Sequence, residues 1–238
     1  MLQNKVALVT GATGTLGRTV TRMLLENGVK VVATYRNKDK LNDLFKFVGA
    51  LKENVTGIEA DVTHEQSVQS LVKKAIERHG RIDYLLNIAG AYAGGSDIST
   101  TDESQWDFMM SVNLKSAFLC TKAVLPHMMG QNYGRIVSVS SRTAVEKGRR
   151  AKSGAYAVSK AGIIILTETI AEEVRNHNIN VNCIMPSTID TPDNRRNFPK
   201  ADFSKWVDPK DIAEVILFLL SDSSKVTSGA CIPVYGKA

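Results

Sequence analysis

A tyrosine and a lysine stand four residues apart in "SGAYAVSK", residues 153–160, where a long apolar segment begins. On a helix, residues i and i+4 lie one turn apart on the same face, so the Lys160 ammonium would lie near the Tyr156 phenol. Two unit charges about 4 Å apart at an effective dielectric constant of about 20 interact by roughly 4 kcal/mol, or about three pKa units. We therefore expect Lys160 to lower the Tyr156 pKa toward neutrality, which would make the phenol a general acid or base.

A serine hydroxyl is expected beside this pair. Ser141 ends the apolar segment "RIVSVSS", residues 135–141, which predicts a strand, and it precedes Tyr156 by fifteen residues. At the end of that strand its hydroxyl would point toward the phenol and could hydrogen-bond a carbonyl oxygen. Ser141, Tyr156 and Lys160 together predict a site that activates an oxygen atom of a small-molecule substrate.

Short β-branched segments alternate with segments of helical periodicity along the whole chain. The predicted strands are residues 5–10, 30–35, 55–60, 83–87, 135–140, 179–185 and 231–235, with six helices between them. Strands that are apolar on both faces and alternate with helices indicate a parallel sheet covered on both sides. The predicted fold is α/β: a Rossmann-type, doubly wound, parallel seven-stranded sheet in one domain, residues 1–238. Such sheets bind ligands at the carboxyl ends of their strands.

Three glycines lie between the first predicted strand and the first predicted helix. Gly11, Gly14 and Gly17 fall in "TGATGTLGRTV", residues 10–20. Glycines there let the backbone turn tightly and approach a pyrophosphate, which then sits on the amides of the helix N-terminus. The motif predicts a dinucleotide site, and plain turn glycines are the alternative when the triplet is taken alone.

The end of the second strand indicates which dinucleotide to expect. NAD sites often place an acid there for the ribose 2′-hydroxyl, but "VVATYRN" offers Tyr35 and Arg36. Arg36, with Arg18 just past the last glycine, could pair with a 2′-phosphate, although a solvated arginine is the alternative. We expect NADP(H) to be preferred, with NAD(H) as the other cofactor. Asp61, after the third strand, would either receive the adenine amino group or cap the next helix.

The composition argues against several other classes. The 30 basic and 24 acidic residues give a net charge of +6 that is spread along the chain, without the basic stripe of a nucleic-acid interface. No segment approaches eighteen consecutive apolar residues and the N-terminus reads directly into a strand, so we expect a cytoplasmic protein with no membrane partner. No cluster of histidines, cysteines or carboxylates has metal-ligand spacing, so no metal is expected.

At this point the sequence resembles the short-chain dehydrogenase/reductase family over nearly its whole length. The matching segments, in chain order, are "TGATGTLG", "ADV", "NIAG" at 87–90, "SVNL" at 111–114, "SVSS" at 138–141, "YAVSK" at 156–160 and "PSTIDT" at 186–191. Their order and spacing together are highly specific.

The resemblance implies a role for each matching residue. Tyr156 would donate the proton to the substrate oxygen, and Lys160 would lower its pKa and hold the nicotinamide ribose. Ser141 would polarise the oxygen, and Asn113 would hold a proton-relay water. The nicotinamide would supply the hydride. The implied cofactor-binding residues are Gly11, Thr13, Gly14, Thr15, Leu16, Gly17, Arg18, Tyr35, Arg36, Asp61, Val62, Asn87, Ala89, Gly90, Pro186, Ser187, Thr188 and Thr191, together with Tyr156 and Lys160.

Three features depart from the family pattern. Thr15 stands where the second motif glycine is usual, with Gly14 one place early, so we expect a different loop geometry over the phosphates. Pro186-Ser187 replaces Pro-Gly and "NIAG" replaces "NNAG", changes that a cofactor floor can absorb. Ser141 precedes Tyr156 by more residues than is usual. The extra residues fall in basic "EKGRRAK", 146–152, either beside the substrate mouth or in an extended surface loop.

A long irregular segment is expected at 186–208, and within it "STIDTPDNRRNFPKADFSKW", 187–206, resembles the corresponding loop of dihydropteridine reductases. The segment "AYAGGS" after "NIAG" is also similar to that branch. Tyr92 could then place a flat ring beside a planar heterocycle, and a loop aromatic that covers the cleft rim is the alternative.

These observations predict an NADPH-preferring oxidoreductase that reduces a carbonyl or quinonoid substrate with Tyr156 as the acid. One alternative is a pterin reductase proper. Another, from a different class, is a catalytically silent sensor protein that binds the dinucleotide, which retention of Asn113, Ser141, Tyr156 and Lys160 argues against. The resemblance also implies a homotetramer or homodimer, formed through the helices that carry Asn113 and Tyr156.

Overall fold

The computed structural model describes residues 2–237 and contains one parallel sheet of seven strands in the order β3-β2-β1-β4-β5-β6-β7. This confirms the predicted fold class. The strands are β1 (Val6–Thr10), β2 (Lys30–Tyr35), β3 (Val55–Glu59), β4 (Tyr84–Asn87), β5 (Gly134–Val139), β6 (Ile179–Pro186) and β7 (Cys231–Val234). The order reverses between β1 and β4, which are neighbours at the centre of the sheet, and this switch point is where doubly wound sheets bind ligands.

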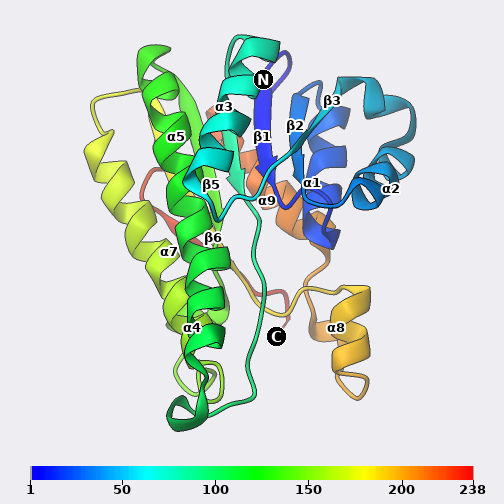
Figure 1. The fold of residues 1–238 in the computed structure, drawn as a ribbon, viewed down its shortest axis with the longest axis vertical. Helices are drawn as coiled ribbons and strands as arrows, with labels where there is room; N and C mark the ends of the chain where they lie inside the picture. Colours follow the sequence, from blue (N-terminus) through cyan, green and yellow to red (C-terminus); the bar gives the residue numbers. More distant parts are fainter. Residues whose placement is uncertain (1, 238) are drawn as a thin grey trace.

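Six helices connect successive strands and cover both faces of the sheet (Figure 1). They are α1 (Thr15–Glu26), α2 (Lys38–Val48), α3 (Glu65–His79), α5 (Ser116–Gly130), α7 (Gly154–Glu173) and α9 (Pro209–Leu220). Three shorter helices lie in the connections after β4, β5 and β6: α4 (Glu103–Met109), α6 (Arg142–Val145) and α8 (Pro192–Asn197). All seven strands and all six long helices are where the sequence pattern predicts them.

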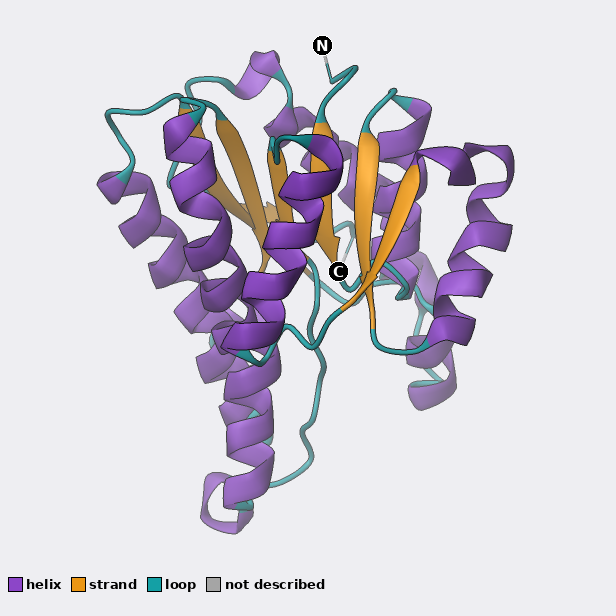
Figure 2. Ribbon diagram, turned by 45° about the horizontal axis from the view of Figure 1, so that its top comes forward, coloured by secondary structure: helices purple, strands orange, loops and turns teal. Residues whose placement is uncertain are grey.

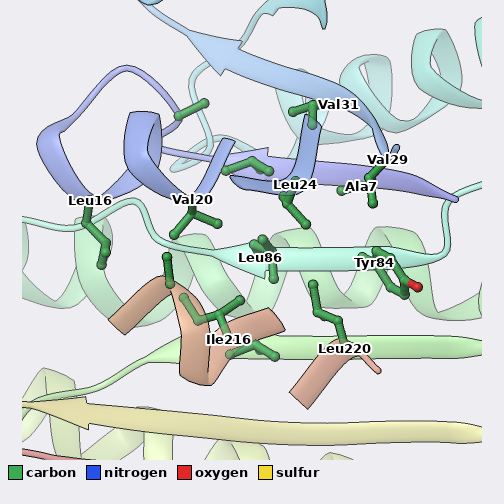
Figure 3. Packing of buried hydrophobic residues seen from close by; sticks show 14 of the residues in the cluster. Ala7, Leu16, Val20, Leu24, Val29, Val31, Tyr84, Leu86, Ile216 and Leu220 are labelled. Atoms are coloured by element: carbon green, nitrogen blue, oxygen red, sulfur yellow. The ribbon is translucent and has the colours of Figure 1, made fainter. Parts of the chain in front are cut away.

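Two apolar layers hold the sheet between its helices (Figure 2). One layer joins alternate strand residues to α1, α2 and α9; in Figure 3, Leu24 of α1 and Ile216 of α9 pack against Leu86 of β4. The other layer joins the intervening strand residues to α3, α5 and α7. Because successive strand residues point to opposite faces, a continuous apolar strand supplies both layers.

The central helical run from α4 to α5 is continuous over Glu103–Gly130 and includes a π-helical turn at Met110–Lys115. By length and composition alone this run is apolar enough to cross a membrane, with a mean hydropathy of 1.2 in its best 18-residue window. The run nevertheless does not contain eighteen consecutive apolar residues, which is the property that the sequence analysis considered. The run behaves as a core helix, because Leu119, Val124 and Met128 of α5 are buried against the sheet.

The segment expected to be irregular at 186–208 is more ordered than predicted. It contains α8 and a short 3₁₀ turn at Phe203–Lys205, and a bridge between Ile189 and Val207 draws its ends together. The Thr191 side chain accepts a hydrogen bond from Asn194 N, and Pro192 opens α8, so the usual helix-start signals are present in "TPDN". They specify only six residues, which is too short for a periodic signal.

Candidate active site and dinucleotide cleft

A cleft of about 920 Å³ lies along the carboxyl ends of the strands, from the glycine turn after β1 to the N-terminus of α7. It is the site that the switch point predicts. Most of the predicted site residues line it: Gly11, Thr13, Gly14, Thr15, Leu16, Gly17, Tyr35, Arg36, Asp61, Val62, Ala89, Gly90, Tyr92, Ser141, Tyr156, Lys160, Pro186, Ser187, Thr188 and Thr191. Among the described residues there is no group of three or more potential metal ligands.

Three predicted residues do not line the cleft. The Arg18 guanidinium lies 5.0 Å from the centre of the Phe47 ring of α2, and Arg18 is not among the residues that line the cleft. Asn87 is buried under the floor, where its side-chain amide donates to Thr121 and Ser138. Asn113 is also buried, 1% exposed, directly beneath the floor. Arg18 therefore lies against α2, and the two asparagines support the cleft from below; the roles expected of Asn87 and Asn113 stay predictions.

The glycine turn leaves room for a close approach to the backbone. Gly11 has φ of +65°, and a Cβ built there would lie 2.8 Å from Ala89 N; one on Gly17 would lie 2.0 Å from Gly11 O. A Cβ on Gly14 would meet only Gly11 O, at 3.5 Å. Gly14 instead caps α1, whose first turn has no side-chain acceptor and no acid, so its amides remain available for an anion. The glycine shifted by one place therefore keeps a turn that fits a pyrophosphate.

Thr10, which sequence analysis did not single out, ties this turn to the neighbouring strand. Its buried hydroxyl donates to Leu86 O, 3.2 Å, and accepts from Ile88 N and Ala89 N, both 3.1 Å. The side chain thus joins the end of β1 to the segment after β4 across the switch point. A threonine directly before the first motif glycine is the sequence signal that could have found it.

The adenosine end of the cleft carries one exposed arginine and one acid. Arg36 lines the cleft, and it takes part in none of the ion pairs found among residues 2–237. Asp61 accepts hydrogen bonds from Thr63 N and its hydroxyl, and lies 3.2 Å from His64 Nδ1; the Thr63 bonds hold the Asp61 pKa below its usual range. His64 is the N-cap of α3, so Asp61 shapes the turn before the cap while it faces the cleft.

Tyr156 and Lys160 lie one turn apart on α7, as predicted, but their electrostatics differ from the expectation. Burial raises the Tyr156 pKa, a hydrogen bond with Ser141 acts in the opposite direction, and Tyr92 raises it further. Lys160 is not among the groups that shift it. The prediction that the ammonium brings the phenol toward neutrality is therefore wrong for this structure, because desolvation outweighs charge proximity. The phenol stays protonated at neutral pH.

The Lys160 side chain is 5% exposed and its ammonium donates to Val139 O at 2.7 Å. Burial lowers the Lys160 pKa to about 8. Ser140, another residue that sequence analysis missed, donates its hydroxyl to Lys160 O at 2.7 Å and so ties α7 to the end of β5. A Cβ on Gly90 would lie 3.3 Å from Lys160 Nζ, which explains why the floor has no side chain there.

The sequence predicted that Ser141 ends the strand, but β5 stops two residues earlier, at Val139. It is instead the N-cap of α6, and its Oγ accepts from Thr143 N at 3.2 Å. Its hydroxyl lies against the Tyr156 phenol, as its effect on that pKa shows. The expected meeting of Ser141 and Tyr156 is confirmed, although the element that positions Ser141 is a helix start.

Asn113 joins three elements through one carboxamide. Its Oδ1 accepts from Ala91 N at 2.9 Å, and its Nδ2 donates to Ala91 O and to Ser159 Oγ, both at 3.1 Å. It lies in the π-helical turn, a distortion that often marks functional sites. Both hydrogens of the Asn113 side-chain amide are therefore used in hydrogen bonds within the protein. That Asn113 holds a relay water stays a prediction.

Tyr92 lies over the outer part of the cleft and is 59% exposed. Its hydroxyl is 3.1 Å from Ser153 Oγ, and its ring meets that of Tyr156 edge-on, with centroids 5.0 Å apart and planes at 79°. The ring therefore packs on the Tyr156 ring, and it anchors the segment after β4 to the start of α7.

Comparisons with known proteins agree with this geometry. A family model described as "short chain dehydrogenase" matches residues 5–202. The 3-oxoacyl-[acyl-carrier-protein] reductase FabG of Thermotoga maritima is 35% identical, covering 99% of this chain and 98% of the relative. The (2S)-[(R)-hydroxy(phenyl)methyl]succinyl-CoA dehydrogenase subunit BbsD of Thauera aromatica is 34% identical, covering 99% and 96%.

Solved structures give the same result. ElxO with NADP bound has a TM-score of 0.91 at 26% identity, and levodione reductase has a TM-score of 0.90 at 27% identity. Each comparison covers 98% of this chain and 97% of the other.

Lys160→Met should change how stability depends on pH. Between about pH 8 and the ordinary lysine value of 10.5, the unfolded chain keeps a proton that buried Lys160 has lost. The free energy of unfolding of the wild type therefore gains up to about 3 kcal/mol across that window, and the variant lacks this gain. Below pH 8 both states are protonated, so the variant avoids the cost of burying an ammonium and is relatively more stable there.

The measurement is urea unfolding followed by circular dichroism at pH 7, 8, 9 and 10. Lys147→Met, at an exposed position, is the control and should run parallel to the wild type. Parallel curves for Lys160→Met as well would show that Lys160 is not a desolvated ammonium.

Proposed function

We propose that this chain, which belongs to the short-chain dehydrogenase/reductase family, is an NADPH-preferring reductase of carbonyl compounds. That it is an NAD(P)-dependent enzyme follows from the family. The observation that carries the finer proposal is the cluster of buried Ser141, partly exposed Tyr156 and buried Lys160 at one end of a cleft whose other end is lined by Arg36.

The residues present fit the dinucleotide. The uncapped first turn of α1 and the close glycine turn suit its pyrophosphate, and Arg36 suits a 2′-phosphate because a guanidinium forms charge-assisted hydrogen bonds with phosphate oxygens. Lys160 suits the nicotinamide ribose, and Ser187, Thr188 and Thr191 suit the carboxamide end. Bound NADPH supplies a hydride from C4 of its nicotinamide.

The protein's own part in the reaction is to orient the carbonyl and to protonate it. Ser141 donates a hydrogen bond to the carbonyl oxygen, and Tyr156 donates the proton that this oxygen needs as the carbon receives the hydride. A ketone, a hydride and a proton become an alcohol. The raised Tyr156 pKa keeps the phenol protonated at neutral pH, the state that a proton donor needs.

The substrate class is proposed to be a carbonyl and not a quinonoid pterin. The pterin alternative is supported only by two local likenesses, in residues 187–206 and in the segment "AYAGGS" after "NIAG". Two relatives act, by name, on a 3-oxoacyl thioester and on a hydroxyacyl thioester, which are the two sides of a carbonyl reduction. Levodione reductase is a second reductase, of similar fold. The silent-sensor alternative is set aside because the enzyme family is established and all the proton-transfer groups are present.

Tyr156→Phe should abolish turnover and leave cofactor binding intact. The substitution keeps the ring that packs on Tyr92 and removes only the proton donor, so kcat should fall by about a hundredfold or more, as for other general acids. NADPH oxidation followed by absorbance measures the rate, and nucleotide fluorescence measures binding. Tyr133→Phe is the matched control, because Tyr133 lies against Tyr84 and does not line the cleft. Unchanged turnover in Tyr156→Phe would exclude the phenol as the acid.

Arg36→Ala should weaken NADPH binding and spare NADH. Loss of a charge-assisted contact with the 2′-phosphate is expected to raise the NADPH dissociation constant by about tenfold to a hundredfold. Arg18→Ala is the control, since Arg18 rests on Phe47 outside the cleft and should leave the ratio of the two affinities unchanged. Fluorescence titration with both nucleotides makes the comparison. Equal losses for NADPH and NADH in Arg36→Ala would mean that Arg36 has a structural role.

A further inference from the structure

Two arginines form the wall of the cleft beside Ser141, and neither was predicted as a site residue. Arg142 follows Ser141 directly and Arg149 lies in the basic segment 146–152; both line the cleft. The sequence analysis placed this inserted segment either beside the substrate mouth or in an extended surface loop. The structure places it beside the substrate mouth, on the substrate side of the proton donor.

These arginines share a single carboxylate. Glu146 accepts from Arg142 Nε and, at 3.1 Å, from its second terminal nitrogen, while Arg149 Nε lies 3.0 Å from Glu146 Oε2. Both guanidiniums hold the Glu146 pKa below its usual range, so this carboxylate stays ionised near neutral pH. Two positive charges and one negative charge leave one positive charge unbalanced on this wall.

One nitrogen of Arg142 lacks an acceptor. The Arg142 side chain is 15% exposed, its guanidinium lies 4.7 Å from the centre of the Tyr235 ring, and its Nη1 is buried with no hydrogen-bond partner. Buried polar groups in proteins are nearly always hydrogen-bonded, so this nitrogen is a donor for which the described residues supply no acceptor. The Arg149 side chain is 50% exposed and is paired through its Nε, so its terminal nitrogens are the ones that face the cleft.

Hydrogen bonds hold the segment 146–152 in place. Arg150 donates to Ala144 O at 3.0 Å, Gly95 N donates to Lys152 O at 2.7 Å, and Ser153 contacts the Tyr92 hydroxyl. The inserted segment is thus tied to α6 on one side and to the segment after β4 on the other. Such support orients a binding residue before a ligand arrives, which reduces the entropy lost on binding.

We propose that Arg142 and Arg149 bind a carboxylate group of the substrate, so that this enzyme reduces oxo acids in preference to neutral ketones. Arg142 already holds Glu146 through its Nε and one terminal nitrogen, so the direct contact falls to the exposed terminal nitrogens of Arg149. A carboxylate there would neutralise the excess charge of the pair. The inference rests on the proposed function, since it assigns the substrate class of the same site.

The test compares two ligands that differ only in charge. The probes are 4-oxo-4-phenylbutanoate and its primary amide, titrated calorimetrically into the enzyme saturated with NADP⁺, which cannot reduce them. We expect the wild type to bind the carboxylate about tenfold to a hundredfold more tightly than the amide, the value of one or two charge-assisted hydrogen bonds. The same ratio should appear in kcat/KM with NADPH.

Variants separate recognition from support. Arg149→Gln and Arg142→Gln should each lower the carboxylate-to-amide ratio toward one while amide affinity changes little. Lys147→Gln controls for the general field of the basic segment, because Lys147 is exposed and does not line the cleft. Arg150→Gln controls for support of α6. Both controls should keep the ratio; if Arg142→Gln does not fold, the result for exposed Arg149 decides.

A wild type that binds both probes equally, or binds neither, would overturn the proposal, as would a carboxylate preference that survives in Arg149→Gln. Failure of the proposed function has a different signature: a titration without nucleotide would still detect carboxylate binding, while NADPH would remain unoxidised by any carbonyl compound offered. The two failures are therefore distinguishable.

Discussion

The buried ammonium of Lys160 sets the arrangement of the whole active site. An ammonium withdrawn from water is costly unless an acceptor meets it, and here Val139 O is that acceptor, at the last residue of β5. This bond holds α7 against the end of β5, and a Cβ on Gly90 would lie 2.8 Å from Asn113 Oδ1 and 3.3 Å from Lys160 Nζ. Tyr156 lies one turn earlier on α7, so the position of the phenol follows from the position of the lysine.

Hydrogen bonds of buried side chains connect the start of α7 to the rest of the cleft. The Thr10 hydroxyl joins β1 to the segment after β4, and the Asn113 carboxamide joins that segment to α7 through Ala91 and Ser159. The pyrophosphate turn and the proton donor are thus parts of one bonded unit across the centre of the sheet. Two packed apolar layers supply the rigidity, because the same strands carry both apolar faces.

Much of this could be predicted from the sequence, because strand and helix periods, turn glycines and the Tyr156–Lys160 spacing are local properties. What could not be predicted depends on contacts between distant residues. Burial, and not the neighbouring charge, dominates the Tyr156 pKa, and Arg18 is diverted by a ring of α2. The position of residues 146–152 beside the cleft depends on a contact with α6, the hydrogen bond from Arg150 to Ala144 O. α8 was missed because six residues carry too little periodic signal.

The central claim is that NADPH reduces a carbonyl carbon at this site by direct hydride transfer. The most direct measurement uses NADPH that carries deuterium at both C4 positions of the nicotinamide, in ordinary water, with a ketone substrate, and locates the label in the product alcohol by mass spectrometry. The account predicts one deuterium on the carbinol carbon for each nucleotide oxidised. An alcohol whose carbinol hydrogen comes from water, or oxidation of the nucleotide without alcohol formation, would contradict it.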